Sequence, residues 1–207
     1  MTDSAAQDVI LVDTQVANIA SMLAALRRLG ATPRLSQDPH EIAQADHVVL
    51  PGVGAFGPGM QRLHELGLTQ VLGERIRQGQ HTLCVCLGLQ LLTHTSQEAP
   101  GVAGLGVLDA HVVRFESPDV LVPQLGWNKV SPEDGCAMLQ EGYAYFANSY
   151  HLDRIPEGWR GATSTHGEVF VAAVERGGVL ACQFHPELSG VWGLELMRRW
   201  LTFDGAR

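Results

Sequence analysis

The 207-residue chain carries a net charge of −8, and hydrophobic residues make up 45% of it. This composition is typical of a soluble globular protein, and the length predicts a single domain spanning residues 1–207. The acidic balance, with no Lys/Arg cluster longer than two residues, argues against a nucleic-acid surface or an anionic membrane surface as the main partner.

The first half of the chain alternates between predicted strands and helices. Apolar runs predict strands at 9–12, 32–35, 47–50 and 81–85. Helical spacing predicts helices at 19–29, at 38–45 with Asp38 as cap, at 60–77 with a break near Gly67, and at 87–96. This order predicts a mostly parallel central sheet covered by helices on both faces.

The second half is predicted to add antiparallel strands to that sheet. Short β-rich segments occupy 111–115, 120–123, 143–150, 160–165, 169–174 and 179–183. Gly177 and Gly178 predict a hairpin turn between the last two strands. An amphipathic helix at 192–201 ends the chain. The expected fold class is therefore α/β with an antiparallel extension.

The N-terminal residues allow a prediction of the protein's location, and the cysteine spacing allows a prediction of its metal content. The polar start, MTDSAAQD, lacks the basic and apolar segments of a signal peptide, and no apolar run approaches the about 20 residues that span a bilayer. A cytoplasmic location is therefore expected. Cys84, Cys86, Cys136 and Cys182 are too few for a disulfide framework and lack zinc-ligand spacing, so we expect no metal and no cofactor.

Cys86 is the first candidate catalytic residue. It stands between a predicted strand and a predicted helix, which is the arrangement of a nucleophile elbow. The N–H groups of a helix N-terminus favour a thiolate there, and Gly88 permits a close approach of neighbouring elements. The alternative is that Cys86 is a small buried hydrophobic residue, the commoner fate of a free cysteine. Cys84 lies inside the strand, where we expect it to be buried and unreactive.

His185 and Glu187 are the candidate base and its orienting carboxylate. An apolar strand leads to His185, Pro186 prevents the strand from continuing, and Glu187 can point to the same side. A neutral histidine can take the proton of a thiol, and a carboxylate fixes its tautomer. The alternative is a loop histidine near an exposed glutamate. Because both Cys86 and His185 follow strands at the ligand-binding edge of a parallel sheet, their combination favours catalysis.

Five segments of the sequence carry a family resemblance: 51–57 (PGVGAFG), 86–92 (CLGLQLL), 126–128 (GWN), 145–150 (YFANSY) and 185–187 (HPE). They resemble the class I (triad) glutamine amidotransferases and, within them, the glutaminase subunits of imidazole glycerol phosphate synthase of histidine biosynthesis. The cysteine and HPE motifs identify the superfamily, whereas PGVGAFG and GWN indicate this subunit. The resemblance extends from near residue 9 to near residue 200.

The resemblance implies that Cys86, His185 and Glu187 hydrolyse glutamine to glutamate and ammonia. The backbone N–H groups of Gly52 and Leu87 would stabilise the oxyanion. The residues implied to bind the substrate's α-amino acid end are Gln90, Glu98, Ser149 and Tyr150. The 51–54 segment is expected to switch this site by a peptide flip.

The implied partner is a (β/α)8-barrel cyclase, in a heterodimer. It would use the ammonia to make imidazole glycerol phosphate and an aminoimidazole carboxamide ribonucleotide. The residues implied to lie near the interface are Leu125, Trp127, Asn128 and Tyr145. For Trp127 and Tyr145, packing in the core is an equal alternative.

Four places depart from the family's usual pattern. Cys84 stands where glycine is common, the 13–19 loop is not glycine-rich, and Gln124 and Leu188 replace a common histidine and lysine on the partner-facing side. Other functions also fit the sequence: a glutaminase subunit of another biosynthetic complex, a stand-alone γ-glutamyl thiol hydrolase, or a non-catalytic scaffold.

Overall fold

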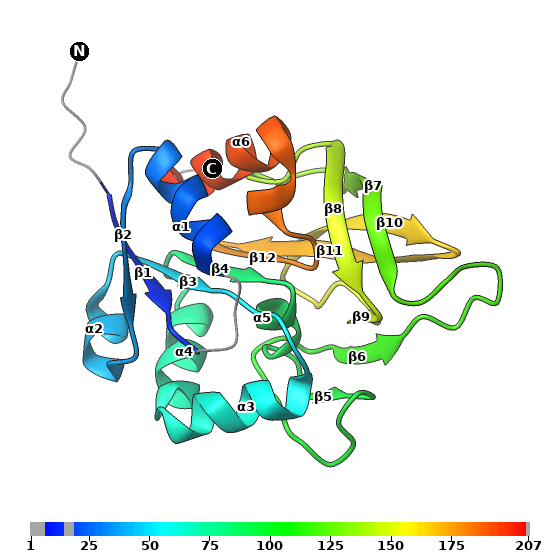
Figure 1. The fold of residues 1–207 in the computed structure, drawn as a ribbon, viewed down its shortest axis with the longest axis horizontal. Helices are drawn as coiled ribbons and strands as arrows, with labels where there is room; N and C mark the ends of the chain where they lie inside the picture. The colour runs from blue at the N-terminus through cyan, green and yellow to red at the C-terminus, as the bar shows by residue number, and fades with distance from the viewer. Residues whose placement is uncertain (1–6, 15–18, 206–207) are drawn as a thin grey trace.

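The apolar runs of the first half form parallel strands, and the segments between them form helices (Figure 1). The computed structural model describes residues 7–14 and 19–205. The helices are α1 (Ile19–Arg28), α2 (Pro39–Gln44), α3 (Phe56–Glu65), α4 (Leu68–Arg77), α5 (Leu87–Gln90) and α6 (Gly190–Leu201), with a 3-10 turn η1 (Pro186–Leu188). The strands are β1 (Asp8–Val12), β2 (Thr32–Ser36), β3 (His47–Leu50), β4 (Thr82–Val85), β5 (Thr95–Ser96), β6 (His111–Arg114), β7 (Gln124–Pro132), β8 (Gly142–Asn148), β9 (Tyr150–Leu152), β10 (Arg160–His166), β11 (Glu168–Arg176) and β12 (Val179–Cys182).

The strands join into one mixed sheet in the order β2-β1-β3-β4-β12-β11-β10-β7-β8. The pairs from β2 to β12 are parallel, and those from β12 to β8 are antiparallel. Short β5, β6 and β9 lie off this path. In the central pair, Cys182 of β12 lies beside Val85 of β4. The chain that follows each of these strands therefore emerges at the same edge of the sheet.

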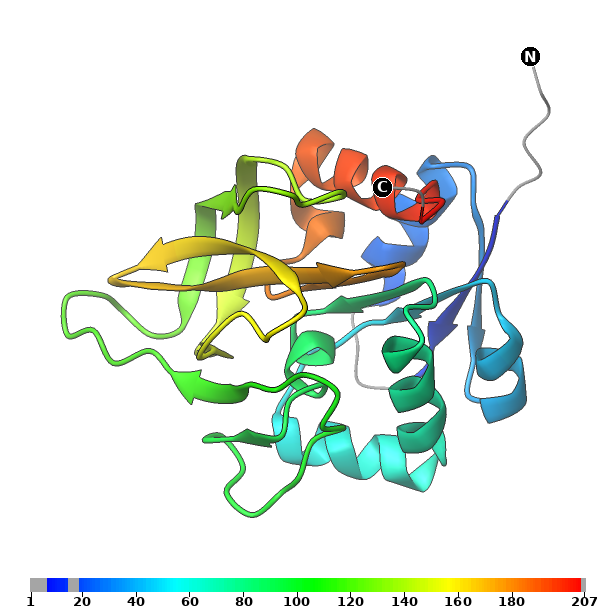
Figure 2. The same cartoon turned by 180° about the vertical axis from the view of Figure 1, so that it is seen from behind.

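Helices cover both faces of the parallel part, as the sequence predicted (Figures 1 and 2). α1 and α6 bury Met22, Leu26 and Trp200 in one hydrophobic cluster. α2, α3 and α4 pack residues such as Leu63 and Leu72 into a second cluster on the other face. No helix in the described ranges is both long and apolar enough to cross a bilayer.

The predicted helix boundaries are confirmed where local chemistry sets them. The side chain of Asp38 accepts a hydrogen bond from the His40 N–H at 2.8 Å, which caps α2. Gly67, with a φ of 67°, separates α3 from α4 in the left-handed conformation that glycine permits.

The prediction of a helix at 87–96 is wrong beyond Gln90. The Leu91 carbonyl accepts from the Leu105 N–H at 2.8 Å, and the Leu92 carbonyl accepts from the Val107 N–H at 2.9 Å. These contacts with a distant segment take the place of helical bonds, and the chain continues into β5.

The predicted strand at 120–123 is also wrong, and β7 directly after it was missed. Residues 120–123 form a loop in which Leu121 is exposed. In β7, Leu125 and Trp127 alternate with Gln124, Gly126 and Asn128, but this pattern covers only five residues and includes a glycine, which is uncommon in strands. β7 is stabilised as a strand by its pairing with β8, because its own residues have only a weak strand preference.

The buried start of β3 predicts a pH dependence of stability. The His47 ring lies against His81 and Trp200, with centroids 4.7 Å and 5.4 Å away. Burial, with the neighbouring His81 charge, lowers the pKa of His47. The unfolded state therefore binds a proton more readily, and the folded protein loses stability as the pH falls below about 6.5. We expect His47→Phe to lose less stability than the wild type between pH 7 and pH 5, measured by urea unfolding. Equal losses in the two proteins would contradict this.

Candidate active site

Cys86 lies in a sharp turn between β4 and α5, in the position that the sequence predicted for it. Its φ of 52° and ψ of −109° make it the one non-glycine residue with a positive φ in the described part of the chain. Such a conformation costs free energy and persists where surrounding contacts hold it. The Cys86 N–H donates to the Cys182 carbonyl at 2.7 Å, which ties the turn to β12.

The 51–54 loop packs directly against this turn through two glycines. A Cβ atom at Gly88 would lie 2.3 Å from the Leu50 carbonyl oxygen, and one at Gly52 would lie 2.4 Å from the Gly88 nitrogen. Neither space admits a side chain. Glycine at both positions therefore allows the loop to reach the turn at Cys86.

His185 is held from both sides by backbone and side-chain contacts. Its N–H donates to the Tyr145 carbonyl at 2.9 Å, and its own carbonyl accepts from the Ser189 hydroxyl at 2.6 Å. The same hydroxyl accepts from the Tyr145 N–H at 3.0 Å. Ser189 therefore links His185 to β8, and it was not singled out from the sequence.

The predicted triad residues come together in the structure. His185 Nδ1 lies 2.9 Å from Glu187 Oε1, and Cys86 acts electrostatically on the same ring. Burial disfavours the charged ring, but the hydrogen bonds and the charges of Cys86 and Glu187 outweigh it and raise the pKa of His185 to about 10. The arrangement suits proton transfer between sulfur and imidazole.

The two predicted oxyanion donors are adjacent, but they do not point to a common acceptor. The Leu87 N–H donates to the Gly52 carbonyl at 3.4 Å. Gly52 thus presents its carbonyl to the turn. In this conformation the Leu87 donor is already occupied.

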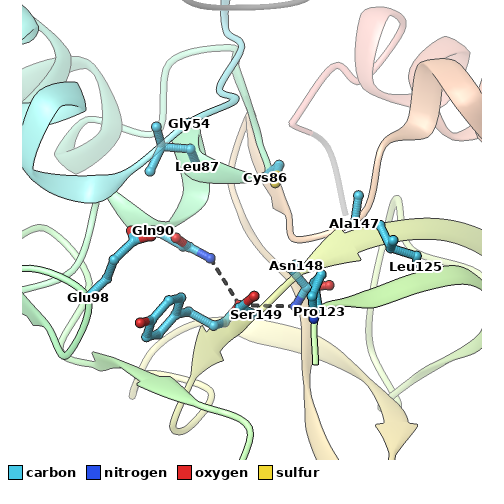
Figure 3. A pocket seen from close by; sticks show the side chains of 11 residues that line it. Gly54, Cys86, Leu87, Gln90, Glu98, Pro123, Leu125, Ala147, Asn148 and Ser149 are labelled. Carbon is cyan, nitrogen blue, oxygen red and sulfur yellow. Dashed lines mark hydrogen bonds between the residues drawn. The ribbon is translucent and has the colours of Figure 1, made fainter. Parts of the chain in front are cut away.

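A cavity of about 230 Å³ opens beside Cys86 and Leu87. All four predicted substrate-binding residues line it: Gln90, Glu98, Ser149 and Tyr150. In Figure 3, Gln90 and Glu98 lie on one side of it and Asn148 and Leu125 on the other. Of the predicted interface residues, Leu125 also contributes to the lining.

Glu98 and Gln90 already have protein partners. Glu98 Oε2 accepts from the Phe56 N–H at 2.7 Å, at the start of α3. Gln90 Nε2 donates to the Tyr150 carbonyl and to Gln183 Oε1, both at 3.0 Å. Gln183 was not predicted as a site residue. The signal was present in the sequence, since it is a polar residue in an apolar run two positions before His185.

The predicted interface residues lie on two neighbouring strands. Leu125, Trp127 and Asn128 belong to β7, and Tyr145 belongs to β8. Leu125 is 69% exposed and Trp127 is 54% exposed, so the core alternative is wrong for Trp127. Tyr145 and Asn128 are half-buried. Trp127 and Tyr145 are paired across the two strands, with ring centroids 6.3 Å apart.

The positions where this sequence departs from the family's usual pattern lie in different structural surroundings. Cys84 is buried, and burial raises its pKa to about 12, which agrees with the expected lack of reactivity. Gln124 was expected on the partner-facing side, but it is 2% exposed and lies beneath that surface. Leu188 is exposed there. Of the 13–19 loop, residues 15–18 lie outside the described residues.

The packing of the loop against the turn predicts a large cost for one added methyl group. Gly88→Ala should lose about 1–3 kcal/mol of unfolding free energy, because the Leu50 backbone cannot move aside easily. Gly57→Ala is the matched control within α3, where the nearest contact would be Ala99 Cβ at 3.5 Å. It should be neutral or gain up to about 1 kcal/mol from helix propensity. Urea unfolding would compare them, and equal stabilities would refute the close approach.

Comparisons with known proteins agree with the fold and the motifs. The profile of the family "Glutamine amidotransferase class-I" matches residues 10–201. The chain is 38% identical over 201 residues to "Imidazole glycerol phosphate synthase subunit HisH" of Nostoc punctiforme, covering 94% of this chain and 95% of the relative. It is 39% identical over 199 residues to "Imidazole glycerol phosphate synthase hisHF, chloroplastic" of Arabidopsis thaliana, covering 93% of this chain and 34% of that protein.

A solved structure described as a glutamine amidotransferase has the same fold, with a TM-score of 0.73 at 23% identity. The superposition covers 93% of this chain and 96% of that one. The predicted α/β fold class is thereby confirmed. The chain belongs to the class I glutamine amidotransferase family and, within it, to the HisH family of imidazole glycerol phosphate synthase subunits.

Proposed function

We propose that this chain is the glutaminase subunit of imidazole glycerol phosphate synthase and that Cys86, His185 and Glu187 carry its chemistry. One observation supports the assignment above the others. Cys86, on a strained turn beside a cavity, interacts with the imidazole of His185, and Nδ1 of that ring lies 2.9 Å from the Glu187 carboxylate. The names of the relatives agree with this activity.

The proposed reaction proceeds through a covalent intermediate. The Cys86 thiolate attacks the side-chain amide carbon of glutamine, and the imidazolium of His185 then protonates the leaving ammonia. A γ-glutamyl thioester remains on Cys86. His185 takes a proton from water, which hydrolyses the thioester and releases glutamate. Glu187 orients the ring throughout by accepting from its Nδ1–H.

The substrate's α-amino acid end would lie along Gln90, Glu98, Ser149 and Tyr150. The Glu98 carboxylate suits the α-ammonium group. Gln90 Nε2 already donates twice, so its Oε1 is the atom left to accept from the same ammonium.

Turnover requires a change in the 51–54 loop. Rotation of the peptide between Gly52 and Val53 would withdraw the Gly52 carbonyl from the Leu87 N–H. It would also turn the Val53 N–H toward the turn. This geometry favours Val53, and not Gly52 as expected from the sequence, as the second oxyanion donor beside Leu87. Gly54, with a φ of 105° and open space around it, can accommodate the rotation.

The proposed partner is the cyclase, bound at an exposed apolar surface. This apolar surface consists of Leu125, Trp127, Leu188 and Val191. Trp127 lies close to Gly190 at the start of α6, which brings β7 and the start of α6 together. Leu125 belongs both to this surface and to the cavity lining. A partner docked here would adjoin the place where ammonia is released, which suits its direct transfer.

Replacement of the nucleophile tests the proposed chemistry. Cys86→Ala should reduce glutamine-dependent synthesis by the complex at least about 1000-fold and leave ammonia-dependent synthesis intact. Cys136→Ala, which changes a cysteine away from the cavity, should retain both activities. Product formation from glutamine and from ammonium salt would be measured with the cyclase present. Glutaminase activity in Cys86→Ala would disprove the assignment.

Substitution at the apolar surface tests the partner. Leu125→Ala should weaken binding to the cyclase by about tenfold, because a central apolar contact contributes more than 1 kcal/mol. It should also reduce the rise in glutaminase rate that the cyclase and its nucleotide produce. Leu35→Ala is the matched control, since Leu35 is 45% exposed on β2 at the opposite edge of the sheet. Calorimetric titration would give both affinities, and equal effects of the two substitutions would exclude this surface.

A further inference from the structure

Gln183 is a completely buried polar residue whose amide faces the reactive sulfur. It follows β12, is 0% exposed, and its backbone N–H donates to the Ala172 carbonyl at 2.8 Å. Its side-chain Nε2 donates to Cys86 Sγ at 3.6 Å. A buried amide without hydrogen-bond partners would cost folding free energy, so the partners of the Gln183 amide are the first evidence of what it does.

The direction of this amide is set by a backbone carbonyl. The Tyr150 carbonyl can only accept, so Gln90 must present its amide nitrogen to it. The same nitrogen donates to Gln183 Oε1, which fixes that oxygen on the side of Gln90. The amide nitrogen of Gln183 therefore points to the sulfur. Reversal of either amide would place two donors or two acceptors against each other.

The sulfur of Cys86 thus accepts a hydrogen bond from Gln183, in addition to its interaction with His185. A donor stabilises a thiolate more than a neutral thiol, because hydrogen bonds to charged groups are the stronger ones. Gln90 lines the cavity and also anchors Gln183, so the chain of hydrogen bonds joins the substrate cavity to the nucleophile.

We propose that Gln183, oriented by Gln90, is a positioning residue whose hydrogen bond aims the Cys86 sulfur at the substrate and favours its thiolate form. The inference rests on Cys86 being the nucleophile of the proposed function. Gln183 would act before attack, when the sulfur is charged, and its contact would weaken as the thioester forms. Its effect is therefore expected in the pH profile of sulfur reactivity.

The test measures alkylation of Cys86 by iodoacetamide across pH, with the modified peptide identified by mass spectrometry. Gln183→Met keeps the length of the side chain and removes the donor. It should raise the apparent pKa of the reaction by about one unit, which makes alkylation about tenfold slower at pH values below the apparent pKa of the wild type. At alkaline pH its rate should meet that of the wild type. Gln183→Glu, which places a carboxylate near the sulfur, should shift the profile further.

Two further variants separate positioning from structural damage. Gln124→Met replaces another buried glutamine, whose side-chain amide atoms have no protein partner, and should leave the profile unchanged. Gln90→Met removes the anchor of Gln183 and should shift the profile in the same direction by a smaller amount. It also provides the test should Gln183→Met fail to fold, as judged by urea unfolding.

The results of these experiments would show whether the role of Gln183 or the proposed function itself is wrong. Unchanged profiles in folded Gln183→Met, Gln183→Glu and Gln90→Met would overturn the role of Gln183 while leaving Cys86 as nucleophile. A uniform loss of rate at all pH values would also overturn it, because that indicates lost access or packing. Glutaminase activity in Cys86→Ala would instead remove the proposed function itself.

Discussion

The parallel pairing of β4 with β12 is the constraint on which the site depends. These strands are far apart in sequence, yet their register places Val85 beside Cys182. Both strands end at these two residues, so Cys86 and His185 emerge at the same edge of the sheet. The hydrogen bond from the Cys86 N–H to the Cys182 carbonyl extends this pairing into the strained turn. Without that register, Cys86 and His185 would not lie close together.

The antiparallel half of the sheet holds His185 and presents the apolar surface. β8 binds the backbone of His185 through Tyr145, directly and through Ser189. The neighbouring β7 carries Leu125 and Trp127 on the outside. Of these two neighbouring strands, β8 holds His185 and β7 carries the exposed apolar residues. The proposed partner, docked on that surface, would contact strands that position His185. Its binding would therefore be able to change the position of His185.

Local sequence signals were sufficient for most of the parallel half. Apolar runs marked β1, β3 and β4, Asp38 marked the start of α2, and Gly67 marked the break between α3 and α4. Each of these depends on interactions within a few residues. The errors arose where distant partners decide the structure. α5 ends early because residues 105 and 107 bond to its end, and β7 is a strand because β8 lies beside it.

The sequence by itself determined which residues are candidates for chemistry: a cysteine at a strand–helix junction, the HPE motif and the substrate set that the family resemblance implies. Only the tertiary structure decided how they are connected. It showed that the Gly52 carbonyl occupies the Leu87 N–H, and that Gln183 lies between Gln90 and the sulfur. The reason is physical. Residue types specify which hydrogen bonds a chain is able to make, but packing decides which donor meets which acceptor.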